Sequence, residues 1–425
     1  MYELVNRFVR VLKKILPGWV VRPFLPLYHG ALAFLLALSY GFPARSLTVI
    51  GITGTKGKST TAEMVFSILR KAGHRTALLS TIRFAIEDHS EPNLFKMTLA
   101  GRGFAQAFMR RALDAGCTHL VVEITSESVL QYRHWFLNLD GLIVTNVQRE
   151  HIERHGSFAH YVAAKRIIVD TLARSPKRKR VLIANDDIPE SHAFLARRGL
   201  TAIGFSAQEL AHLSADDQSI RFEYSGVHFV VPLPGTFSAM NALAAIKLCE
   251  AFGVPLTIAA AALAALPIVR GRMERIEAGQ NFLVIVDYAH TPDSLRALYS
   301  AFPKQRKICV LGNTGGGRDA WKRPEMGNIA DEACEKVILT NEDPYDEDPR
   351  AILDAMTRDM KRAPTIVLDR REAIRAALAS ASAGDAVLIS GKGTDPFIMS
   401  ANGTKIPWSD AQVAREELER LLPEV

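Results

Sequence analysis

The sequence predicts an α/β protein with two consecutive parallel-rich sheets. Short apolar runs alternate with helical stretches from residue 47 to about 270, and a second series of the same kind begins after Pro267. This alternation is typical of strands joined by crossover helices. A glycine-rich turn also joins the first apolar run to the first helical stretch. The expected strands are 47–52, 78–82, 119–124, 141–146 and 180–185, followed by 282–288, 308–312, 337–341, 365–369 and 386–390.

The glycine-rich turn lies in residues 47–61, LTVIGITGTKGKSTT, and predicts a phosphate-binding loop. Glycines let backbone amides approach phosphate oxygens, Lys58 brings a positive charge, and Ser59 or Thr60 offers a hydroxyl to Mg²⁺. The match to the P-loop pattern is imperfect, because Ile52 stands where the first glycine belongs. An ordinary βα turn is the alternative, but it needs no adjacent Gly-Lys-Ser-Thr. The candidate ATP contacts here are Gly54, Thr55, Lys56, Gly57, Lys58, Ser59 and Thr60.

The chain divides into a short N-terminal helical segment, 1–46, and two larger domains, 47–270 and 271–425. In residues 1–16 the apolar side chains share one helical face, and four cations lie mostly on the other. Such a helix either packs on the body of the protein or lies on anionic lipid as a peripheral membrane contact. The four cations are Arg7, Arg10, Lys13 and Lys14.

Composition limits the function classes without choosing among them. Of 425 residues, 48% are hydrophobic and 23% charged, which excludes a disordered chain. The net charge of +7 favours anionic partners but does not separate nucleotides from lipid or nucleic acid. The four cysteines lack CxxC spacing, so we expect no disulfide frame, no zinc site and a reducing cytoplasm. The apolar run 31–38 is too short to cross a bilayer, and no signal-peptide cleavage site follows it.

Several polar residues stand at the ends of expected strands or inside apolar helices. Glu123 and His151 each follow a strand, so together with Ser59 they can complete a divalent-cation site. A buried structural glutamate and a surface histidine are the alternatives. Lys165 lies in an otherwise apolar helical segment, where a lysine usually extends its amine to solvent. His290 lies in a loop expected after a later strand, in the segment VDYAHTPD.

Five ordered segments make the chain similar to the Mur ligase family. They are GITGTKGKSTT, TNVQREHIERHG with AAKR, GTFSAMNALAA, GRMERIEAG with VDYAHTPDSL, and GKG with the IPWSDAQVAREEL tail. The YAHTPD segment resembles the MurE type, which adds the third amino acid of the peptidoglycan peptide. The resemblance covers residues 47 to 422. It implies a P-loop ATPase central domain, a C-terminal Rossmann-like domain that binds the acceptor, and ATP-dependent amide ligation through an acyl phosphate.

The resemblance also implies roles for individual residues. Ser59 or Thr60 with Glu123 would hold one Mg²⁺, and His151 would help to hold a second. Lys165 would be carbamylated, because a hard cation requires an oxygen ligand and an ammonium would repel it. The catalytic residues would be Lys58, Lys165 and His151. The further nucleotide contacts would be Asn241 at the adenine, Asp287 at the ribose and Arg272 between nucleotide and moving domain.

The substrate end departs from the family pattern. The uridine-binding domain is not recognisable in residues 1–46, and Glu127 replaces a family histidine. The clamp arginine of the diaminopimelate enzymes is replaced by Tyr345. Acidic residues 343 and 346–348 form an expected acidic rim, so a lysine-like acceptor is favoured. The candidate substrate contacts are Thr98, Arg133, His290, Arg318, Asp343, Tyr345 and Asp395.

Taken together, these features predict a cytoplasmic enzyme that uses ATP and Mg²⁺, with the inner membrane surface as a candidate location. Its partners would be a peptide-carrying anionic donor and an amino acid, with no nucleic acid. Two alternatives remain open. In the first, the enzyme acts on a donor that is not UDP-linked, such as a pseudomurein, lipid-linked or γ-glutamyl peptide. In the second, the chain is a non-catalytic ATP-binding subunit.

Overall fold

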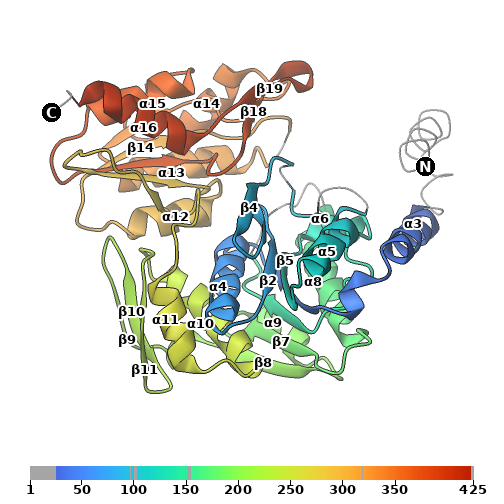
Figure 1. The fold of residues 1–425 in the computed structure, drawn as a ribbon. Coiled ribbons are helices and arrows are strands. Elements are labelled where there is room, and N and C mark those ends of the chain that lie inside the picture. Colours follow the sequence, from blue (N-terminus) through green and yellow to red (C-terminus); the bar gives the residue numbers. More distant parts are fainter. Residues whose placement is uncertain are drawn as a thin grey trace, which may run out of the picture.

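The computed structural model describes residues 25–95, 97–99, 103–148, 150, 155–317 and 319–422. Within these residues the chain forms an eight-stranded sheet, a three-stranded sheet, a six-stranded sheet and a two-stranded ribbon. Figure 1 shows the large sheets in separate lobes, with α3 (Leu25–Ser39) at one side of the first lobe. The predicted α/β class, with a parallel-rich central sheet and a second α/β sheet near the C-terminus, is confirmed.

The central sheet has the order β4-β3-β2-β5-β1-β6-β7-β8. Six of its strands are parallel, whereas β3 and β4 form an antiparallel edge. Because β1 lies in the middle, the loop after it lies between the carboxyl ends of β5 and β6. The strands are β1 (Thr48–Thr53), β2 (Thr76–Leu79), β3 (Arg83–Ile86), β4 (His89–Pro92), β5 (His119–Glu123), β6 (Gly141–Val144), β7 (Val181–Asn185) and β8 (Thr201–Phe205).

Helices cover both faces of the central sheet, which explains why its inner strands are apolar throughout. Alternate residues of a strand face opposite sides. Ile50 therefore packs into the core under α4 and α10, and Val49 into the core under α5 and α8. The helices of this lobe are α4 (Lys58–Lys71), α5 (Phe104–Asp114), α6 (Ser126–Leu130), α8 (Phe158–Ala173), α9 (Pro189–Leu195), α10 (Phe237–Ala251) and α11 (Leu256–Ala264), with short turns η2 (Pro43–Arg45) and η3 (Ala207–Glu209).

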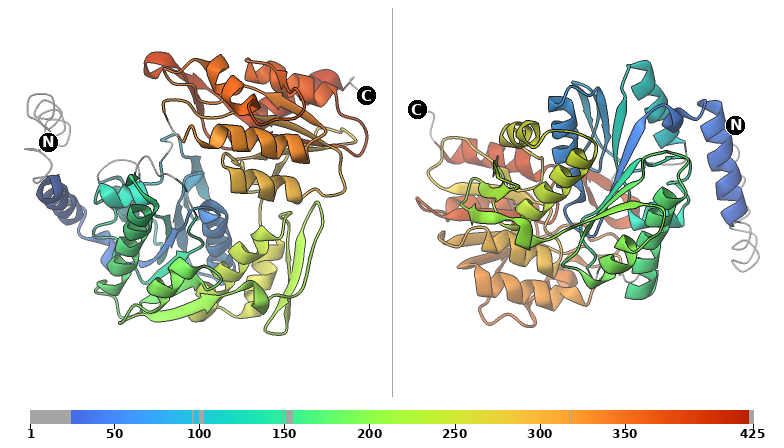
Figure 2. Two further views of the ribbon diagram at one scale, coloured as in Figure 1. Left: turned by 180° about the vertical axis from the view of Figure 1, so that it is seen from behind. Right: turned by 90° about the horizontal axis from the view of Figure 1, so that it is seen from below.

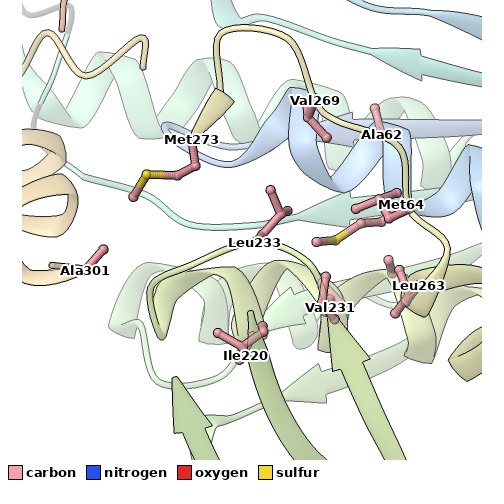
Figure 3. Close-up of a cluster of buried hydrophobic side chains, with 14 of the residues drawn as sticks. Ala62, Met64, Ile220, Val231, Leu233, Leu263, Val269, Met273 and Ala301 are labelled. Atoms are coloured by element: carbon pink, nitrogen blue, oxygen red, sulfur yellow. The ribbon is translucent and has the colours of Figure 1, made fainter. Parts of the chain in front are cut away.

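A three-stranded antiparallel sheet extends the first core towards the second lobe. It consists of β9 (Ala211–Ala215), β10 (Ile220–Tyr224) and β11 (Val227–Val231). Figure 3 shows Leu233 between Met64 of α4 and Met273, which follows the connection between the lobes. The same buried cluster includes Ala301 of the second lobe. The two lobes thus share apolar packing.

The second lobe is a six-stranded sheet of order β12-β13-β17-β14-β15-β16, parallel except for β12. Figure 2 shows it from two further sides, stacked beside the central lobe. Its strands are β12 (Glu274–Arg275), β13 (Leu283–Asp287), β14 (Lys307–Leu311), β15 (Lys336–Leu339), β16 (Thr365–Ile366) and β17 (Ala386–Ser390), and the ribbon is β18 (Phe397–Met399) and β19 (Lys405–Pro407). Its helices are α12 (Pro292–Ser300), α13 (Lys322–Ala333), α14 (Pro349–Thr357), α15 (Arg370–Ala379), α16 (Asp410–Leu421) and η4 (Ala401–Gly403).

The structure corrects three expectations. The strand expected at 78–82 ends at Leu79, because the Ser80 hydroxyl accepts from the amides of Ile82 and Arg83 and turns the chain into β3. Strand β8 was not expected, since as an edge strand it has little apolar pattern. A disulfide joins Cys309 of β14 to Cys334 after α13, so the expectation of no disulfide is wrong here.

No helix among the described residues is both long enough and apolar enough to cross a membrane.

Candidate active site

The loop between β1 and α4 passes so close to its neighbours that two of its positions accept only glycine. A Cβ on Gly57 would lie 2.2 Å from Asn241 Oδ1, and the φ of Gly57 is +77°. A Cβ on Gly54 would lie 1.8 Å from Thr145 Oγ1. The glycines predicted to admit phosphate are therefore also required by the packing of the loop.

The end of β6 fixes the shape of this loop. Asn146 Oδ1 accepts from the amides of Thr55 at 3.1 Å and Lys56 at 2.8 Å. Thr145 Oγ1 donates to the Lys56 carbonyl at 2.6 Å. The first N–H groups of α4 have no acceptor within the helix. Because the contacts above do not use them, they are the groups of this loop that can bind an anion.

Lys58 and Lys165 are two buried lysines of this site. Lys58 Nζ donates to the carbonyls of Gly54 at 3.1 Å and Thr55 at 2.9 Å. Burial lowers the pKa of Lys58, although Glu123 and Glu150 oppose that shift. Lys165 is 1% exposed, so the alternative of an amine extended to solvent is wrong.

Burial, and secondly the charge of Lys58, hold the pKa of Lys165 well below its usual range. The amine of Lys165 lies 4.6 Å from the centroid of the Tyr161 ring. The Tyr161 hydroxyl in turn contacts Thr55 Oγ1 at 2.9 Å, so this helix is tied to the phosphate loop. The depressed pKa favours a neutral amine, which is the nucleophilic form of lysine.

Glu123 is the last residue of β5 and is fully buried. Both of its carboxylate oxygens accept hydrogen bonds from Thr81. Oε1 accepts from the Thr81 amide at 2.9 Å, and Oε2 accepts from the Thr81 hydroxyl at 2.7 Å. Thr81 Oγ1 also contacts Thr98 Oγ1 at 3.2 Å, which places this predicted donor contact near Glu123.

The donors around the loop suit Mg²⁺, because they are carboxylate, hydroxyl and amide oxygens. Thr61 Oγ1 and Gln148 Oε1 are buried without a hydrogen-bond partner in the described part of the chain, which leaves oxygen atoms available near the loop. The described residues contain no group of three His, Cys, Asp or Glu side chains that would hold a metal by themselves. A cation here would therefore depend on Ser59 or Thr60, Glu123 and ligand oxygens.

Glu150 connects the phosphate loop to the second lobe. Its carboxylate lies 2.8 Å from Lys56 Nζ and 3.3 Å from His290 Nε2. His290 Nδ1 faces the Tyr288 carbonyl at 2.6 Å, which requires a proton on that nitrogen. Burial lowers the pKa of Lys56, and Glu150 opposes the shift. A carboxylate between two cation-forming groups from different lobes can hold the site closed.

Arg272 and Asp287 lie together at the entrance to the second lobe. Asp287 accepts from the amides of Met273 and Ala289, both at 2.8 Å. Burial raises the pKa of Asp287, while Arg272 opposes this shift. The Arg272 guanidinium lies 4.5 Å from the centroid of the Tyr288 ring. These positions agree with residues that link nucleotide binding to lobe movement, but they do not test that role.

The far end of the site, in the second lobe, is organised by Lys392, whose side chain is fully buried. Lys392 Nζ lies 2.7 Å from Asp343 Oδ1 and 3.4 Å from Asp395 Oδ2. Asp343 also accepts from the Met399 amide at 2.7 Å. Glu342 accepts from Thr314 Oγ1 at 2.8 Å through Oε1, and its Oε2 is buried without a partner among the described residues.

The expected acidic rim is not a set of free carboxylates. Asp343 is 5% exposed and paired with Lys392, and Glu347 forms two bonds to Arg323. Asp346 accepts from the Asn402 amide, and Asp348 accepts from the first turn of α14. The structure therefore pairs Asp343 and Glu347 with cations, whereas Asp346 and Asp348 are exposed and accept only backbone N–H groups, so these two keep their negative charge.

The donor contact Arg133 lies near Thr98, since its Nη1 donates to the Leu99 carbonyl at 2.5 Å. His151 and Arg318 lie outside the described residues, as do residues 1–16, so their predictions stay untested.

Three contacts were missed by reasoning from the sequence: Asn146, Glu150 and Thr81. Of the three, only Glu150 could have been found from the sequence, because it directly precedes the candidate ligand His151 and follows the end of an expected strand. Nothing in the sequence around Thr81 or Asn146 indicates their partners, which lie 42 and about 90 positions away.

Comparison with known proteins gives two family matches. Residues 52–249 match the Mur ligase middle domain, and residues 271–393 match the glutamate ligase domain of Mur ligases.

Two curated relatives match over most of the chain. The chain is 35% identical to a UDP-N-acetylmuramyl-tripeptide synthetase of Roseiflexus sp., over 92% of this chain and 82% of that one. It is 32% identical, with the same coverage, to a UDP-N-acetylmuramoyl-L-alanyl-D-glutamate–2,6-diaminopimelate ligase of Cytophaga hutchinsonii. A solved structure of a ligase with that same name has a TM-score of 0.61 and 25% identity, over 88% of this chain and 79% of that chain.

Proposed function

The chain belongs to the Mur ligase family of ATP-dependent amide ligases, and on that premise we propose that it joins an amino acid to a peptide on a peptidoglycan-precursor donor. The observation that carries this proposal is the convergence of Lys58, Lys165 and Glu123 at the carboxyl edge of the central sheet. The buried Lys58 beside a phosphate loop suits a reaction in which phosphoryl group, carboxylate and ADP are all anionic, and Glu123 and Lys165 lie where they could help to hold Mg²⁺.

Each residue contributes to holding these anions in line. The N–H groups of α4 and Lys58 would bind the phosphates, and Ser59 or Thr60 with Glu123 would hold Mg²⁺, which offsets charge on the phosphoryl group when bound. Glu150 would keep the second lobe against the loop, so that closure excludes water from a hydrolysis-sensitive acyl phosphate. His151 stays a prediction as a further metal ligand.

Lys165 would carry a carbamate. Its neutral Nζ would attack the carbon of CO₂, so that a C–N bond forms, the pair of one C=O π bond moves to oxygen, and a proton of the amine leaves to solvent. The product would be an anion that could supply oxygen ligands to Mg²⁺ and would be attracted by the charge of Lys58. The support is the depressed pKa of Lys165 together with its burial.

For the acceptor, we propose an amino acid without a second side-chain carboxylate, such as lysine. The acidic rim supports this only through Asp346 and Asp348, because Asp343 and Glu347 are paired with cations. The remaining support is Tyr345 in place of a carboxylate-binding arginine and the unpartnered, buried Oε2 of Glu342, which suits an ammonium group.

We also propose that the enzyme works in the cytoplasm against the membrane surface, through residues 1–16 and α3. The outer side of α3 exposes an apolar stripe of Ala31, Phe34, Leu35 and Leu38, and the helix contains no charged residue. Such an exposed apolar stripe is unusual on a protein surface.

Exposed cations lie in a loop that contacts the chain between α3 and β1. The loop 174–180 carries Arg174, Arg178 and Lys179 on its surface, and Lys177 of this loop donates to the Leu47 carbonyl at 2.5 Å, eight residues after the end of α3. Apolar side chains next to cations are the combination that binds anionic lipid, at about 1 kcal/mol per cation.

Vesicle sedimentation tests this contact. The chain should bind anionic vesicles in a salt-sensitive way, and the double variant Phe34→Ser, Leu35→Ser should lose that binding, whereas Leu213→Ser should keep it. Equal binding by all three proteins would contradict the proposal, as would a change of oligomeric mass in place of lipid binding.

The ligase activity is tested by ADP release from the purified full chain with a panel of peptide donors and free amino acids. ADP should form only when both a donor peptide and an amino acid are present. ATP turnover that ignores the donor would contradict ligation, and an absence of turnover with every pair would favour the non-catalytic alternative.

A further inference from the structure

Lys322, the first residue of α13, is a nearly buried lysine whose charge is only weakly paired. The residue is 6% exposed, and its Nζ lies 3.9 Å from Asp319 Oδ2. That distance permits an ion pair but no hydrogen bond. The other oxygen of Asp319 accepts from Trp321 Nε1 at 3.1 Å. No described residue accepts a hydrogen bond from the amine of Lys322, so its N–H groups can serve a ligand.

The next residue, Arg323, shows what a satisfied cation looks like at this place. It is 4% exposed, and its guanidinium donates to both oxygens of Glu347, at 2.6 and 2.9 Å. The two neighbours are thus buried to a similar degree but paired differently. A buried cation that lacks a close anion is costly, and it is retained where a substrate anion compensates. Lys322 is therefore a candidate for binding an anionic ligand.

Helices α12 and α13 begin side by side at one edge of the second sheet. Each follows a strand, β13 or β14, and both strands run parallel to β17. Both helices therefore start at the carboxyl edge, where open α/β sheets bind ligands. Arg296, in the first turns of α12, lies 2.9 Å from Glu325, in the first turn of α13. This contact places Lys322 beside the start of α12.

The start of α12 faces the phosphate loop. Figure 1 shows α12 on the side of the second lobe that faces the central lobe. His290, just before α12, lies 3.3 Å from Glu150, which in turn lies 2.8 Å from Lys56 of the loop. Burial lowers the pKa of Lys56, Glu150 opposes this shift, and the charge of Lys322 adds to it. Cations from both lobes thus repel each other here unless an anion lies between them.

We propose that Lys322 binds the γ-phosphoryl group of ATP from the side of the second lobe and keeps it during transfer. This inference rests on the proposed function, because it assigns a further residue to that reaction. A carboxylate oxygen of the donor attacks the γ-phosphorus, the bond to the β,γ-bridging oxygen breaks, and ADP leaves with the electron pair. Lys58 belongs to the loop that holds ADP. Lys322 comes from the opposite lobe, so it stays with the phosphoryl group as ADP departs.

Calorimetric titration of the full chain with two nucleotides tests this contact. The probes are ADP and the non-hydrolysable β,γ-methylene analogue of ATP, each with Mg²⁺. Lys322→Met removes the charge at nearly constant size, and Lys322→Arg keeps the charge. Lys336→Met is the matched control, because Lys336 is the first residue of β15 and lies at the amino edge of the same sheet.

Lys322→Met should bind the analogue about tenfold more weakly, the loss of one contact with a charged group, and should bind ADP as wild type does. Lys322→Arg should recover most of the affinity, and Lys336→Met should change neither probe. Unchanged ADP binding also shows that the fold is intact. An unchanged affinity of Lys322→Met for the analogue would overturn the proposal. Equal losses for the analogue and ADP would do the same.

Steady-state kinetics separate a phosphoryl contact from a contact with the acceptor. In Lys322→Met, kcat/KM for ATP should fall about 10- to 100-fold, whereas KM for the amino acid should not change. A loss confined to KM for the amino acid would overturn the proposal, since Lys322 would then bind the acceptor carboxylate.

The two assays together distinguish this inference from the proposed function. Wild-type amide formation, combined with wild-type affinity and rate in Lys322→Met, overturns the role of Lys322 alone. Selective loss of analogue binding in Lys322→Met supports the contact even if no donor yields an amide. That second result would overturn the proposed function alone.

Discussion

The two ends of the candidate site hold buried cations in opposite ways. At the phosphate end, Lys58 and Lys165 have no carboxylate within salt-bridge distance among the described residues, and both have a lowered pKa. At the acceptor end, Lys392 lies 2.7 Å from Asp343, and Arg370 lies 2.7 Å from Asp410 in a pair with no exposed side-chain surface.

This difference teaches which cations serve a ligand and which serve the fold. A buried cation without an anion is costly, and it is retained where a substrate anion or a covalent change compensates. A buried ion pair satisfies itself, and removal of one member leaves an uncompensated charge. Substitution at the phosphate end should therefore cost activity, whereas substitution at the acceptor end should cost stability.

The largest effect is expected for Lys165→Ala. Turnover should be abolished, because no other described side chain supplies the carbamate oxygens, while the unfolding midpoint should not fall. Added short-chain carboxylic acid should restore part of the activity by occupying the space left by the side chain. Ligation near the wild-type rate would remove Lys165 from the mechanism.

Arg370→Met should lower the free energy of unfolding by about 3–5 kcal/mol, because Asp410 would remain buried without its cation. Urea unfolding measures this change. The matched control Arg350→Met breaks an exposed pair with Asp354 and should cost less than about 1 kcal/mol. Similar losses in both variants would show that burial does not distinguish the two pairs.

Lys58→Ala should reduce kcat by about 10²–10³-fold, or about 2.7–4 kcal/mol, by analogy with the loss of one preorganised donor in a transition state. Its unfolding curve should match that of wild type. Lys71→Ala, at the other end of the same helix, is the control. An unchanged rate of ADP release in Lys58→Ala would refute its role.

Glu150→Gln should lower kcat/KM for ATP by about tenfold to hundredfold, as expected for a lost charge-assisted contact of about 1.5–3 kcal/mol. The variant keeps the shape of the side chain but weakens its hold on Lys56 and His290. Glu325→Gln, a surface acid of α13 paired with Arg296, should have no effect. If both variants behave alike, Glu150 does not hold the lobes together.

The smallest effect concerns pH. The folded pKa of Lys165 is lowered, so between that value and its unfolded value near 10.5 the unfolded chain binds more protons. Stability of wild type relative to Lys165→Met should therefore rise with pH in this window, by at most about 1.4 kcal/mol per pH unit. Urea unfolding at several alkaline pH values in carbonate-free buffer measures the slope, and a constant difference would mean that Lys165 is not neutralised on folding.

Local sequence predicted the phosphate end well because its chemistry is contiguous. Gly54 to Thr60 form one loop, and the apolar runs around them identify the strand and helix that present it. The contacts of Glu123 and the burial of Lys165 depend on tertiary packing. The position of Glu123 at a strand end suggested a cation site, but only the resemblance to a family indicated that Lys165 is important.

The acceptor end was harder to predict because pairing there joins residues that are distant in sequence. Asp343 finds Lys392, 49 positions away, so a run of acids that reads as a free surface is in fact satisfied. The same limit applies to Cys309 and Cys334, which are 25 positions apart. The sequence gives the sign of the charge on each side chain, but it does not identify the residue with which that side chain pairs.

The central claim is amide formation through an acyl phosphate, and an oxygen-label experiment tests it most directly. The donor carboxylate is labelled with ¹⁸O, and the released phosphate is analysed by mass spectrometry during ligation. The account predicts one ¹⁸O in each phosphate formed with amide product, because the carboxylate oxygen attacks the phosphoryl group and leaves with it. Phosphate without the label, released at the rate of amide formation, would contradict it.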